Sequence, residues 1–273
     1  MERLEFAKLS GTGNDFILID NRSGLVRPEA LPDLARRICR RRVSVGADGL
    51  IAIEDSERAS FRWRFYNADG SEAAMCGNGG RCAARFACAR GICGPRLSFE
   101  TLAGIIHAEV KARTVKLELL PPEKLTQDIS ISLDSEVVRM DAITVGVPHV
   151  VIHTGDLEAW DVDRVGRRIR FHPLFQPEGT NVNFARVEGP SEISVRTYER
   201  GVEGETLACG TGSVASALIG SLRCGITSPV SVKTRGEEIL VVYFRTVRDG
   251  FEELFLEGET TWVYEGHILP EAL

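Results

Sequence analysis

Two cysteines, each followed by two glycines, are the residues of this chain best suited to chemistry. Met75-Cys76-Gly77-Asn78-Gly79 and Ala208-Cys209-Gly210-Thr211-Gly212 are both Cys-Gly-x-Gly turns, and each leads into a run of small residues that suits a helix. A cysteine at a helix N-terminus lies beside unpaired backbone N–H groups and the positive end of the helix dipole. That setting favours the thiolate, the nucleophilic and basic form of the side chain.

A single turn of this kind would leave an inert cysteine as an equal alternative, because unbridged cysteine often serves as a small apolar filler. The repetition favours a pair that acts on one small molecule. A thiolate on one face of a carbon and a thiol on the other suit inversion of a centre that carries an acidic hydrogen. Glycines let the backbone approach an anion such as a substrate carboxylate.

We interpret the other five cysteines as structural, since two fall in the run after the first turn and three have no motif context. Seven cysteines, an odd number, in a chain whose N-terminus lacks an apolar signal core do not suggest a disulfide framework, so we expect a cytoplasmic protein. No pattern suits pyridoxal phosphate, a dinucleotide or a metal, so we expect no cofactor and no metal site. The cysteines interpreted as structural are Cys39, Cys82, Cys88, Cys93 and Cys224.

Composition argues against several classes of partner. The 273 residues carry a net charge of −6, and 7% of them are aromatic, whereas nucleic-acid binders need a basic stripe or stacking aromatics. No apolar run approaches the roughly 20 residues of a membrane span. We therefore expect a small-molecule ligand, with no nucleic acid and no membrane as partner.

The second half of the chain repeats the first. Cys76 and Cys209 are 133 residues apart, and so are Gly46 and Gly179. A break at Pro121-Pro122 separates the two copies. Such a repeat predicts two like-folded halves, whose cysteine-headed helices can face each other across one cleft.

Local patterns predict the first elements. Strands are expected at 6–10 and 16–20, and from position alone Asn14, between them, indicates turn chemistry more than a ligand contact. An amphipathic helix is expected over 32–42, with Arg40-Arg41-Arg42 as a solvated face. Further strands are expected at 50–54, 60–66, 96–100 and 105–119.

Motifs along nearly the whole chain resemble the diaminopimelate epimerase family, of a pyridoxal-independent amino-acid racemase superfamily. Taken together and in this order they are specific. They are Gly13-Asn14-Asp15-Phe16, Phe65 to Glu72, Met75 to Gly79 with Arg81-Cys82, Thr101 to Gly104, Gly146 to His149, Gly179 to Phe184, and Glu199-Arg200-Gly201 running to Glu205 through Gly212.

The resemblance implies a role for each matched position. Cys76 and Cys209 match the acid/base pair, and the positions whose backbone amides hold the carboxylate at the reacting centre are Gly77, Asn78, Gly210 and Thr211. The residues that resemble the binders of the substrate and its distal amino-acid end are Asn14, Asn67, Asn181, Glu199 and Arg200. His149 and Glu199 match polar groups that assist proton transfer.

A purely structural role is an alternative for some of these residues, and two positions depart from the family pattern. A lone histidine is more often structural, and Glu199-Arg200 could be an exposed ion pair of little weight. Val147 stands where many members have asparagine. The segment from Glu199 to Cys209 is one residue longer than in many members, with Val202-Glu203-Gly204 as the link.

The fold implied is α+β, with two pseudo-symmetric domains. Each would be a curved, mostly antiparallel β-sheet or barrel around a central α-helix, with the active site in the cleft between them. We expect residues 1–121 to form the first domain, joined by the tail 264–273, and residues 122–263 to form the second. The resemblance also implies a homodimer.

The activity implied is cofactor-independent epimerisation of LL-2,6-diaminopimelate to the meso isomer, in lysine and peptidoglycan precursor biosynthesis. One alternative is a proline or hydroxyproline racemase of the same superfamily. Alternatives from other classes are a thiol redox protein, in which Cys76 and Cys209 form a disulfide, and a non-enzymatic amino-acid binding protein.

Overall fold

The computed structural model describes residues 4–133, 136–248, 250–269 and 271. Contacts divide the chain into two compact units, Met1–Glu118 with Gly258–Leu273, and Leu119–Glu257. These bounds lie a few residues before those expected from the sequence.

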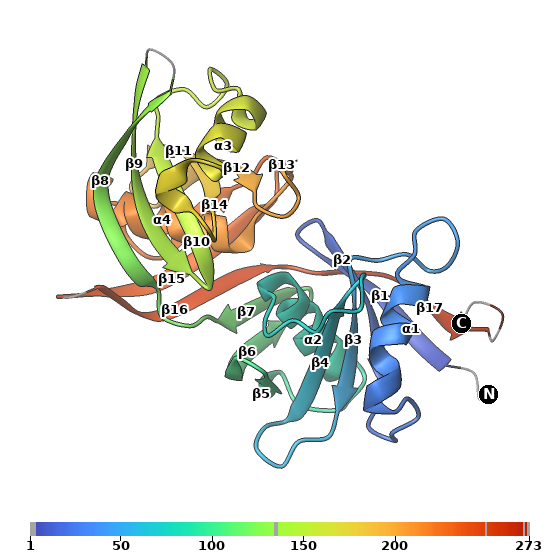
Figure 1. Cartoon of the computed structure of the whole chain (residues 1–273). Helices are drawn as coiled ribbons and strands as arrows, with labels where there is room; N and C mark the ends of the chain where they lie inside the picture. The colour runs from blue at the N-terminus through green and yellow to red at the C-terminus, as the bar shows by residue number, and fades with distance from the viewer. Residues whose placement is uncertain (1–3, 134–135, 249, 270, 272–273) are drawn as a thin grey trace. The chain divides into compact units, whose positions relative to one another are not determined.

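The first unit is a mixed sheet with two helices packed on it (Figure 1). Its strands pair in the order β17-β1-β2-β3-β4-β5-β6-β7. The elements are β1 (Leu4–Gly11), β2 (Asn14–Asp20), η1 (Pro28–Ala30), α1 (Leu31–Ile38), β3 (Gly49–Glu54), β4 (Phe61–Asn67), α2 (Gly77–Ala89), β5 (Arg96–Thr101), β6 (Gly104–Lys111), β7 (Thr114–Glu118) and β17 (Thr261–Ile268).

The second unit is built in the same way. Its strands pair in the order β8-β9-β10-β11-β12-β14-β15-β16, and β13 adds to β12. The elements are β8 (Glu123–Leu133), β9 (Glu136–Val145), β10 (Val147–His153), α3 (Val162–Arg170), η2 (Pro173–Phe175), β11 (Asn181–Gly189), β12 (Glu192–Glu199), β13 (Gly204–Thr206), α4 (Gly210–Cys224), β14 (Val230–Lys233), β15 (Ile239–Val247) and β16 (Gly250–Glu259).

The strand ladders of the two units repeat each other pair by pair. In the first, β2 and β3 are parallel and linked through α1, and β4 and β5 are parallel and linked through α2. In the second, β10 and β11 are parallel and linked through α3, and β12 and β14 through α4. The ladder pairs that flank these are antiparallel in both units. The predicted α+β class and the repetition of one fold in two halves are confirmed.

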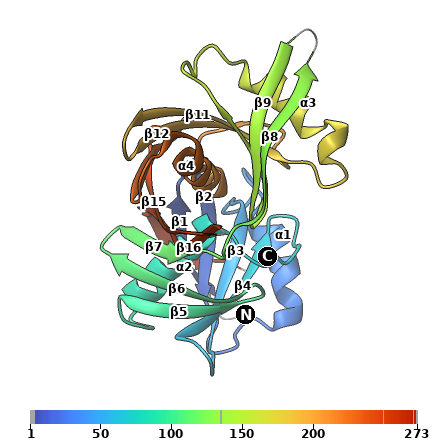
Figure 2. The same cartoon turned by 90° about the vertical axis from the view of Figure 1, so that its left-hand side faces the viewer.

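Each unit wraps its strands around one central helix. In α4 nine consecutive residues, Gly212–Gly220, are buried, and in α2 the seven residues from Asn78 to Ala84 are. Consecutive buried residues cover every side of a helix, so protein must surround it on all sides. Figure 2 shows α4 nearly end-on with β9, β11, β12 and β15 around it. The small side chains of both helices let the strands approach closely.

Two sequence predictions of element bounds were wrong. The strand expected at 105–119 is the hairpin of β6 and β7, which turns at Ala112 with φ 54°. Its apolar alternation continues across the turn, which no Gly, Pro or Asn marks. The helix expected over 32–42 ends at Ile38, and Arg42 has φ 71°.

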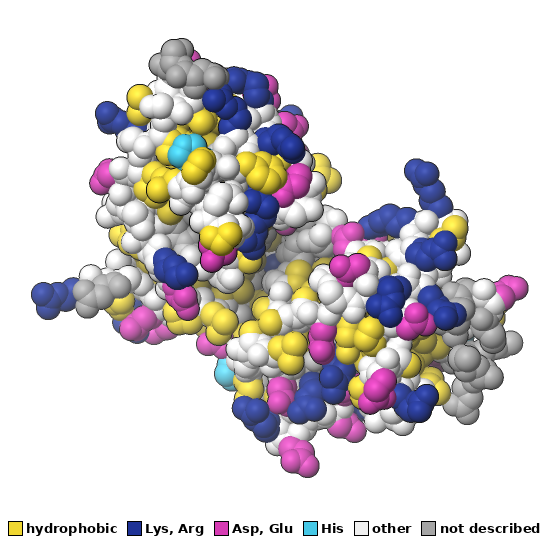
Figure 3. Space-filling view, viewed as in Figure 1, with side chains coloured by type: hydrophobic (Ala, Val, Ile, Leu, Met, Phe, Trp, Pro, Cys, Tyr) yellow, Lys and Arg dark blue, Asp and Glu magenta, His cyan; other side chains and the backbone are white. Residues whose placement is uncertain are grey.

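The surface carries both signs of charge. On the face drawn in Figure 3, Lys and Arg side chains are interspersed with Asp and Glu. Within the part of the chain that the structure describes, no helix has both the length and the apolar character needed to span a bilayer.

Leu218→Ala tests whether α4 is the core of the second unit. Leu218 is fully buried among core side chains, so we expect the change to lower the free energy of unfolding by about 2–5 kcal/mol. Leu222→Ala, one turn later and 39% exposed, should change it by about 0.5 kcal/mol or less. Urea unfolding measures both, and equal losses would contradict a buried α4.

Candidate active site

Cys76 is the N-cap of α2. Its backbone is extended, at φ −148° and ψ 120°, and its carbonyl accepts the first helical hydrogen bond from Gly80 N at 2.8 Å. The N–H groups of residues 77–79 precede that bond, so the helix itself does not use them. The half-buried thiol therefore lies at a turn whose amides and helix dipole favour an anion.

Cys209 is the N-cap of α4 with the same geometry. Its φ is −125° and ψ is 111°, and its carbonyl accepts from both the N–H and the hydroxyl of Ser213 at 2.9 Å. Its Sγ lies 3.7 Å from the Thr211 hydroxyl, and the residue is 7% exposed. The equivalent places of the two cysteines match the sequence prediction that each heads a helix.

Other cysteines differ in their surroundings. Burial raises the pKa of Cys39 and of Cys82 to about 12, and burial with the nearby Cys88 raises that of Cys93 to about 11. A thiol with such a pKa stays protonated and unreactive at neutral pH. This agrees with the structural interpretation of Cys39, Cys82 and Cys93.

Asn14 and Asn78 contact each other in the first unit. Asn78 Nδ2 donates to Asn14 Oδ1 at 2.7 Å, and Asn14 Nδ2 donates to Asp48 Oδ2 at 3.0 Å. The structure thus brings the first residue of β2 to the residue that follows Gly77 at the start of α2. The Asn14 side chain therefore links Asn78 to Asp48, in addition to its place beside the turn.

Arg41 holds the two carboxylates beside Asn14, a contact that the sequence did not predict. Its guanidinium donates to Asp15 Oδ1 at 2.6 Å and to Asp48 Oδ1 at 2.8 Å. Burial acts to raise the pKa of Asp15, but Arg41 and Lys8 outweigh it and hold that pKa below its ordinary value. Residues 40–42 are exposed, as the sequence predicted, and Arg41 also pairs with two carboxylates from this exposed position.

Asn67 is the last residue of β4, opposite Gly49 of β3. Its side chain donates to Ser71 Oγ at 3.0 Å, and its backbone N–H donates to Ser71 O at 2.9 Å. The hydrogen bond of the Asn67 side chain therefore lies within the turn of residues 67–71.

His149 belongs to a buried polar network on β10, β11 and β12. Asn183 Nδ2 donates to Val150 O at 2.9 Å and contacts His149 Nδ1 at 3.2 Å, while Thr197 Oγ1 donates to Asn183 Oδ1 at 2.9 Å. Because an amide nitrogen only donates, His149 Nδ1 accepts and the proton of the neutral ring is on Nε2. Burial, with the charge of Arg200, lowers the pKa of His149 to about 3.

The same network reaches the turn of Cys209. A Cβ added to Gly212 would lie 2.3 Å from Asn183 Oδ1 and 3.2 Å from Thr197 Oγ1. Only glycine allows this approach. His149 is therefore joined through Asn183 to the first turn of α4.

Asn181 uses its amide within the protein. Its Nδ2 donates to Pro148 O at 3.1 Å, and its Oδ1 accepts from Arg200 N at 2.8 Å. The Arg200 side chain donates to Glu178 O at 2.8 Å. Asn181 thus holds the strand that carries His149 and the turn that follows Glu199.

Glu203, in the longer segment after Glu199, has four partners. Its backbone N–H donates to Glu199 O at 2.8 Å, and its carboxylate accepts from Arg170 Nε at 3.2 Å, Gly201 N at 3.0 Å and Tyr198 Oη at 3.1 Å. Burial acts to raise its pKa, but these donors outweigh it and the pKa is lowered. The longer segment is therefore an anchored turn.

Some site residues escaped the sequence reading. The sequence analysis did not propose a role for Asn183, Thr197, Asp48 or Thr12. Asn183 lies next to Val182 on β11, and its side chain is fully buried. A polar residue at an inward position of a strand is the signal that could have found it.

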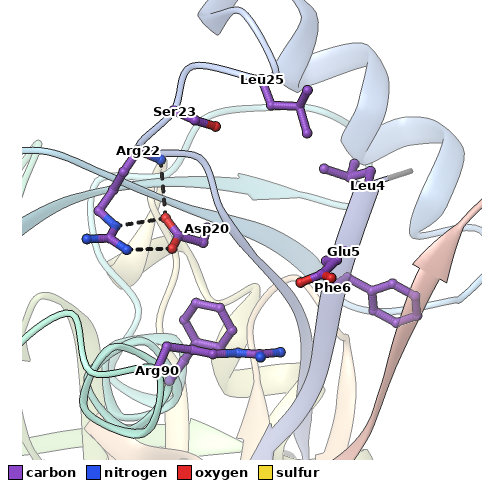
Figure 4. Close-up of a pocket in the computed structure, with 9 residues that line it drawn as sticks. Leu4, Glu5, Phe6, Asp20, Arg22, Ser23, Leu25 and Arg90 are labelled. Carbon is purple, nitrogen blue, oxygen red and sulfur yellow. Dashed lines mark hydrogen bonds and ion pairs between the residues drawn. The ribbon is translucent and has the colours of Figure 1, made fainter. Parts of the chain in front are cut away.

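A cavity of about 420 Å³ in the first unit is not this site (Figure 4). It lies at the C-terminal end of α2, where Arg90 is the C-cap, about 20 Å along the helix from Cys76. Its arginines are engaged, Arg22 with Asp20 at 2.8 Å and Arg90 with Glu265 at 2.9 Å. Across residues 4–133, 136–248, 250–269 and 271, no group of three or more His, Cys, Asp or Glu could hold a metal ion.

Comparison with known proteins gives consistent matches. The family model described as diaminopimelate epimerase matches residues 6–123 and 142–263. Diaminopimelate epimerase of Aquifex aeolicus is 46% identical and covers 99% of both chains, and that of Chlorobaculum tepidum is 44% identical over 95% of this chain and 99% of the other.

Solved structures with low identity share the fold. A phenazine biosynthesis protein of the PhzF family from Bacillus anthracis has a TM-score of 0.76 at 16% identity, over 98% of this chain and 100% of that one. A probable proline racemase from Agrobacterium radiobacter has a TM-score of 0.68 at 15% identity, over 98% and 95%. At such identities the likeness concerns the fold alone.

The depressed pKa of His149 predicts a pH dependence of stability. Between pH 6.5, the ordinary value, and pH 3 the unfolded chain binds a proton that the folded ring refuses, so stability falls as pH falls through this window. The slope from one group approaches 1.4 kcal/mol per pH unit. We expect His149→Gln to lose this part of the slope in urea unfolding between pH 7 and 5. A ring whose NMR signals titrate near pH 6.5 in the native protein would contradict the prediction.

Proposed function

Because the chain belongs to the diaminopimelate epimerase family, we propose that this protein inverts one α-carbon of LL-2,6-diaminopimelate and forms the meso isomer. The observation that carries the proposal is the pair of cysteines, Cys76 and Cys209, that cap the equivalent helices α2 and α4. The protein would supply a precursor of lysine and peptidoglycan.

Inversion requires a base on one face of the α-carbon and an acid on the other. In the proposed reaction one cysteine, as thiolate, removes the α-proton, and the other, as thiol, delivers its proton to the opposite face. The first thiolate becomes a thiol and the second thiol becomes a thiolate, so the pair ends ready for the reverse reaction. No electron pair leaves the substrate, and the residues need no redox partner.

The carbanion that forms between the two proton transfers needs positive potential. We propose that the amides of Gly77 and Asn78, with those of Gly210 and Thr211, hold the α-carboxylate as charge spreads onto it. Such donors are fixed before the reaction, so they stabilise developing charge without reorganising. The positive N-terminal ends of the α2 and α4 dipoles would also stabilise this negative charge.

The remaining residues would bind the ends of the substrate and tune the thiols. Asn14 and Asn67 are proposed to contact it directly, with Glu199 and Arg200 facing its charged groups. The amide of Asn181 binds Pro148 O and Arg200 N, so Asn181 would act by holding the turn that follows Glu199. His149 would assist proton transfer as a neutral N–H donor, and Glu199 as an acceptor.

The proposal extends to the state of the protein in the cell. Two reactive thiols need a reducing compartment, so we propose the cytoplasm. We also propose a homodimer, which the family resemblance implied and sedimentation would test. No cofactor, nucleic acid or membrane is part of the proposed mechanism.

Proton NMR of LL-diaminopimelate with the reduced protein in D2O tests the function. Loss of the α-proton signal with formation of the meso isomer is the expected result. Exchange with proline or hydroxyproline instead would move the protein to another activity of the superfamily. No exchange with any amino acid would favour the redox or binding alternatives.

Cysteine variants test the mechanism. Cys76→Ala and Cys209→Ala should each lower the rate of inversion by about 10²-fold or more, because each removes one of the two proton-transfer groups. Cys224→Ala, at the exposed last residue of α4, serves as the matched control and should keep wild-type turnover. Near-normal inversion by Cys76→Ala would refute the two-thiol mechanism.

A further inference from the structure

Thr12 has a backbone conformation that suits its side chain poorly. It lies in the turn between β1 and β2 with φ 54°, followed by Gly13 with φ 88°, and it is 4% exposed. A branched Cβ makes the left-handed region unfavourable, and turns that need it normally use Gly or Asn. A strained residue of this kind persists only where its surroundings hold it, and such residues cluster at functional sites.

Arg81 holds the Thr12 side chain. Its guanidinium is wholly buried, and one nitrogen, Nη2, donates both to Thr12 Oγ1 and to Asn78 Oδ1, the latter at 2.8 Å. Thr12 lies two residues before Asn14 in the chain, and Asn78 donates a hydrogen bond to Asn14. One buried cation therefore fastens the β1–β2 turn to the first turn of α2.

The hydrogen bonds form a chain with a fixed direction. Arg81 donates to Asn78, Asn78 donates to Asn14, and Asn14 donates to Asp48. Arginine can only donate and an ionised aspartate can only accept, so both ends impose the same orientation on the two amides. Each amide nitrogen keeps a second N–H for an acceptor such as a substrate carboxylate.

We propose that Thr12 and Arg81 are positioning residues that orient Asn14 and Asn78 toward the substrate. The inference rests on the proposed function, which makes these two asparagines substrate contacts. The Thr12 hydroxyl is required because it gives Arg81 an acceptor in the β1–β2 turn and so ties that turn to α2. The strain at φ 54° is the consequence of using threonine where a hydroxyl is needed.

Three substitutions at Thr12 separate positioning from stability. Thr12→Ser keeps the hydroxyl, Thr12→Val keeps the branched shape without it, and Thr12→Gly removes the strain and the hydroxyl together. We expect Ser to keep the KM for LL-diaminopimelate, and Val and Gly to raise it roughly tenfold with kcat changed less than about threefold. Thr12→Gly should have a Tm at or above that of Thr12→Val, because both lack the hydroxyl and only glycine suits this conformation.

The decisive pattern is a raised KM in both Thr12→Val and Thr12→Gly, whichever of the two has the higher Tm. Tm is measured beside kcat and KM, and Thr114→Val on β7 is the control for the change of side chain, with wild-type KM expected. If Thr12→Val does not fold, Thr12→Gly carries the test. Wild-type KM in Thr12→Gly, or a fall of kcat at unchanged KM, would overturn the positioning role. A wild-type protein inactive on diaminopimelate would instead overturn the proposed function.

Discussion

The first turn of a helix presents backbone N–H groups that the helix cannot satisfy, and the arrangement of both units depends on this constraint. The strands surround α2 and α4 on their sides, and the proposed function uses the N-terminal end of each helix. Cys76 and Cys209 stand at those ends with extended backbones, where the thiol lies beside the amides of its own turn. The fold that buries each helix therefore also fixes the place of the cysteine to which we assign the chemistry.

Close approach to the helix start determines which residues can stand there. Gly212 leaves room for Asn183, which holds His149 and is held by Thr197. Any side chain at Gly212 would displace that amide. In the first unit, a Cβ at Gly11 would lie 2.9 Å from Asn78 O, so the β1–β2 turn meets α2 in the same way. Glycines at these places connect packing to the site and do more than permit a turn.

The sequence predicted the repeated fold, the two cysteine N-caps and the family, because each leaves a local or periodic signal. It could not predict contacts between residues far apart in the chain. Arg41 belongs to a run of arginines that is exposed as predicted, but nothing local indicated that it binds Asp15, 26 residues earlier. The turn at Ala112 was missed because nothing in its residue types breaks the strand pattern. Helix α3 was also missed, although Asp161 caps it by accepting from Arg164 N.

The repeat keeps the backbone and changes the side chains, which makes the two halves unequal. Phe16 on β2 and His149 on β10 are 133 residues apart, the spacing of the two cysteines. A Cβ on Gly79 would contact the Phe16 ring at 3.5 Å, whereas one on Gly212 would meet the amide bound to His149. An apolar ring thus stands by one helix start and a buried polar network by the other. Surroundings set the proton affinity of a thiol. Two cysteines on equivalent backbones therefore stand in different surroundings, and in the proposed reaction each would act on one face of the same carbon.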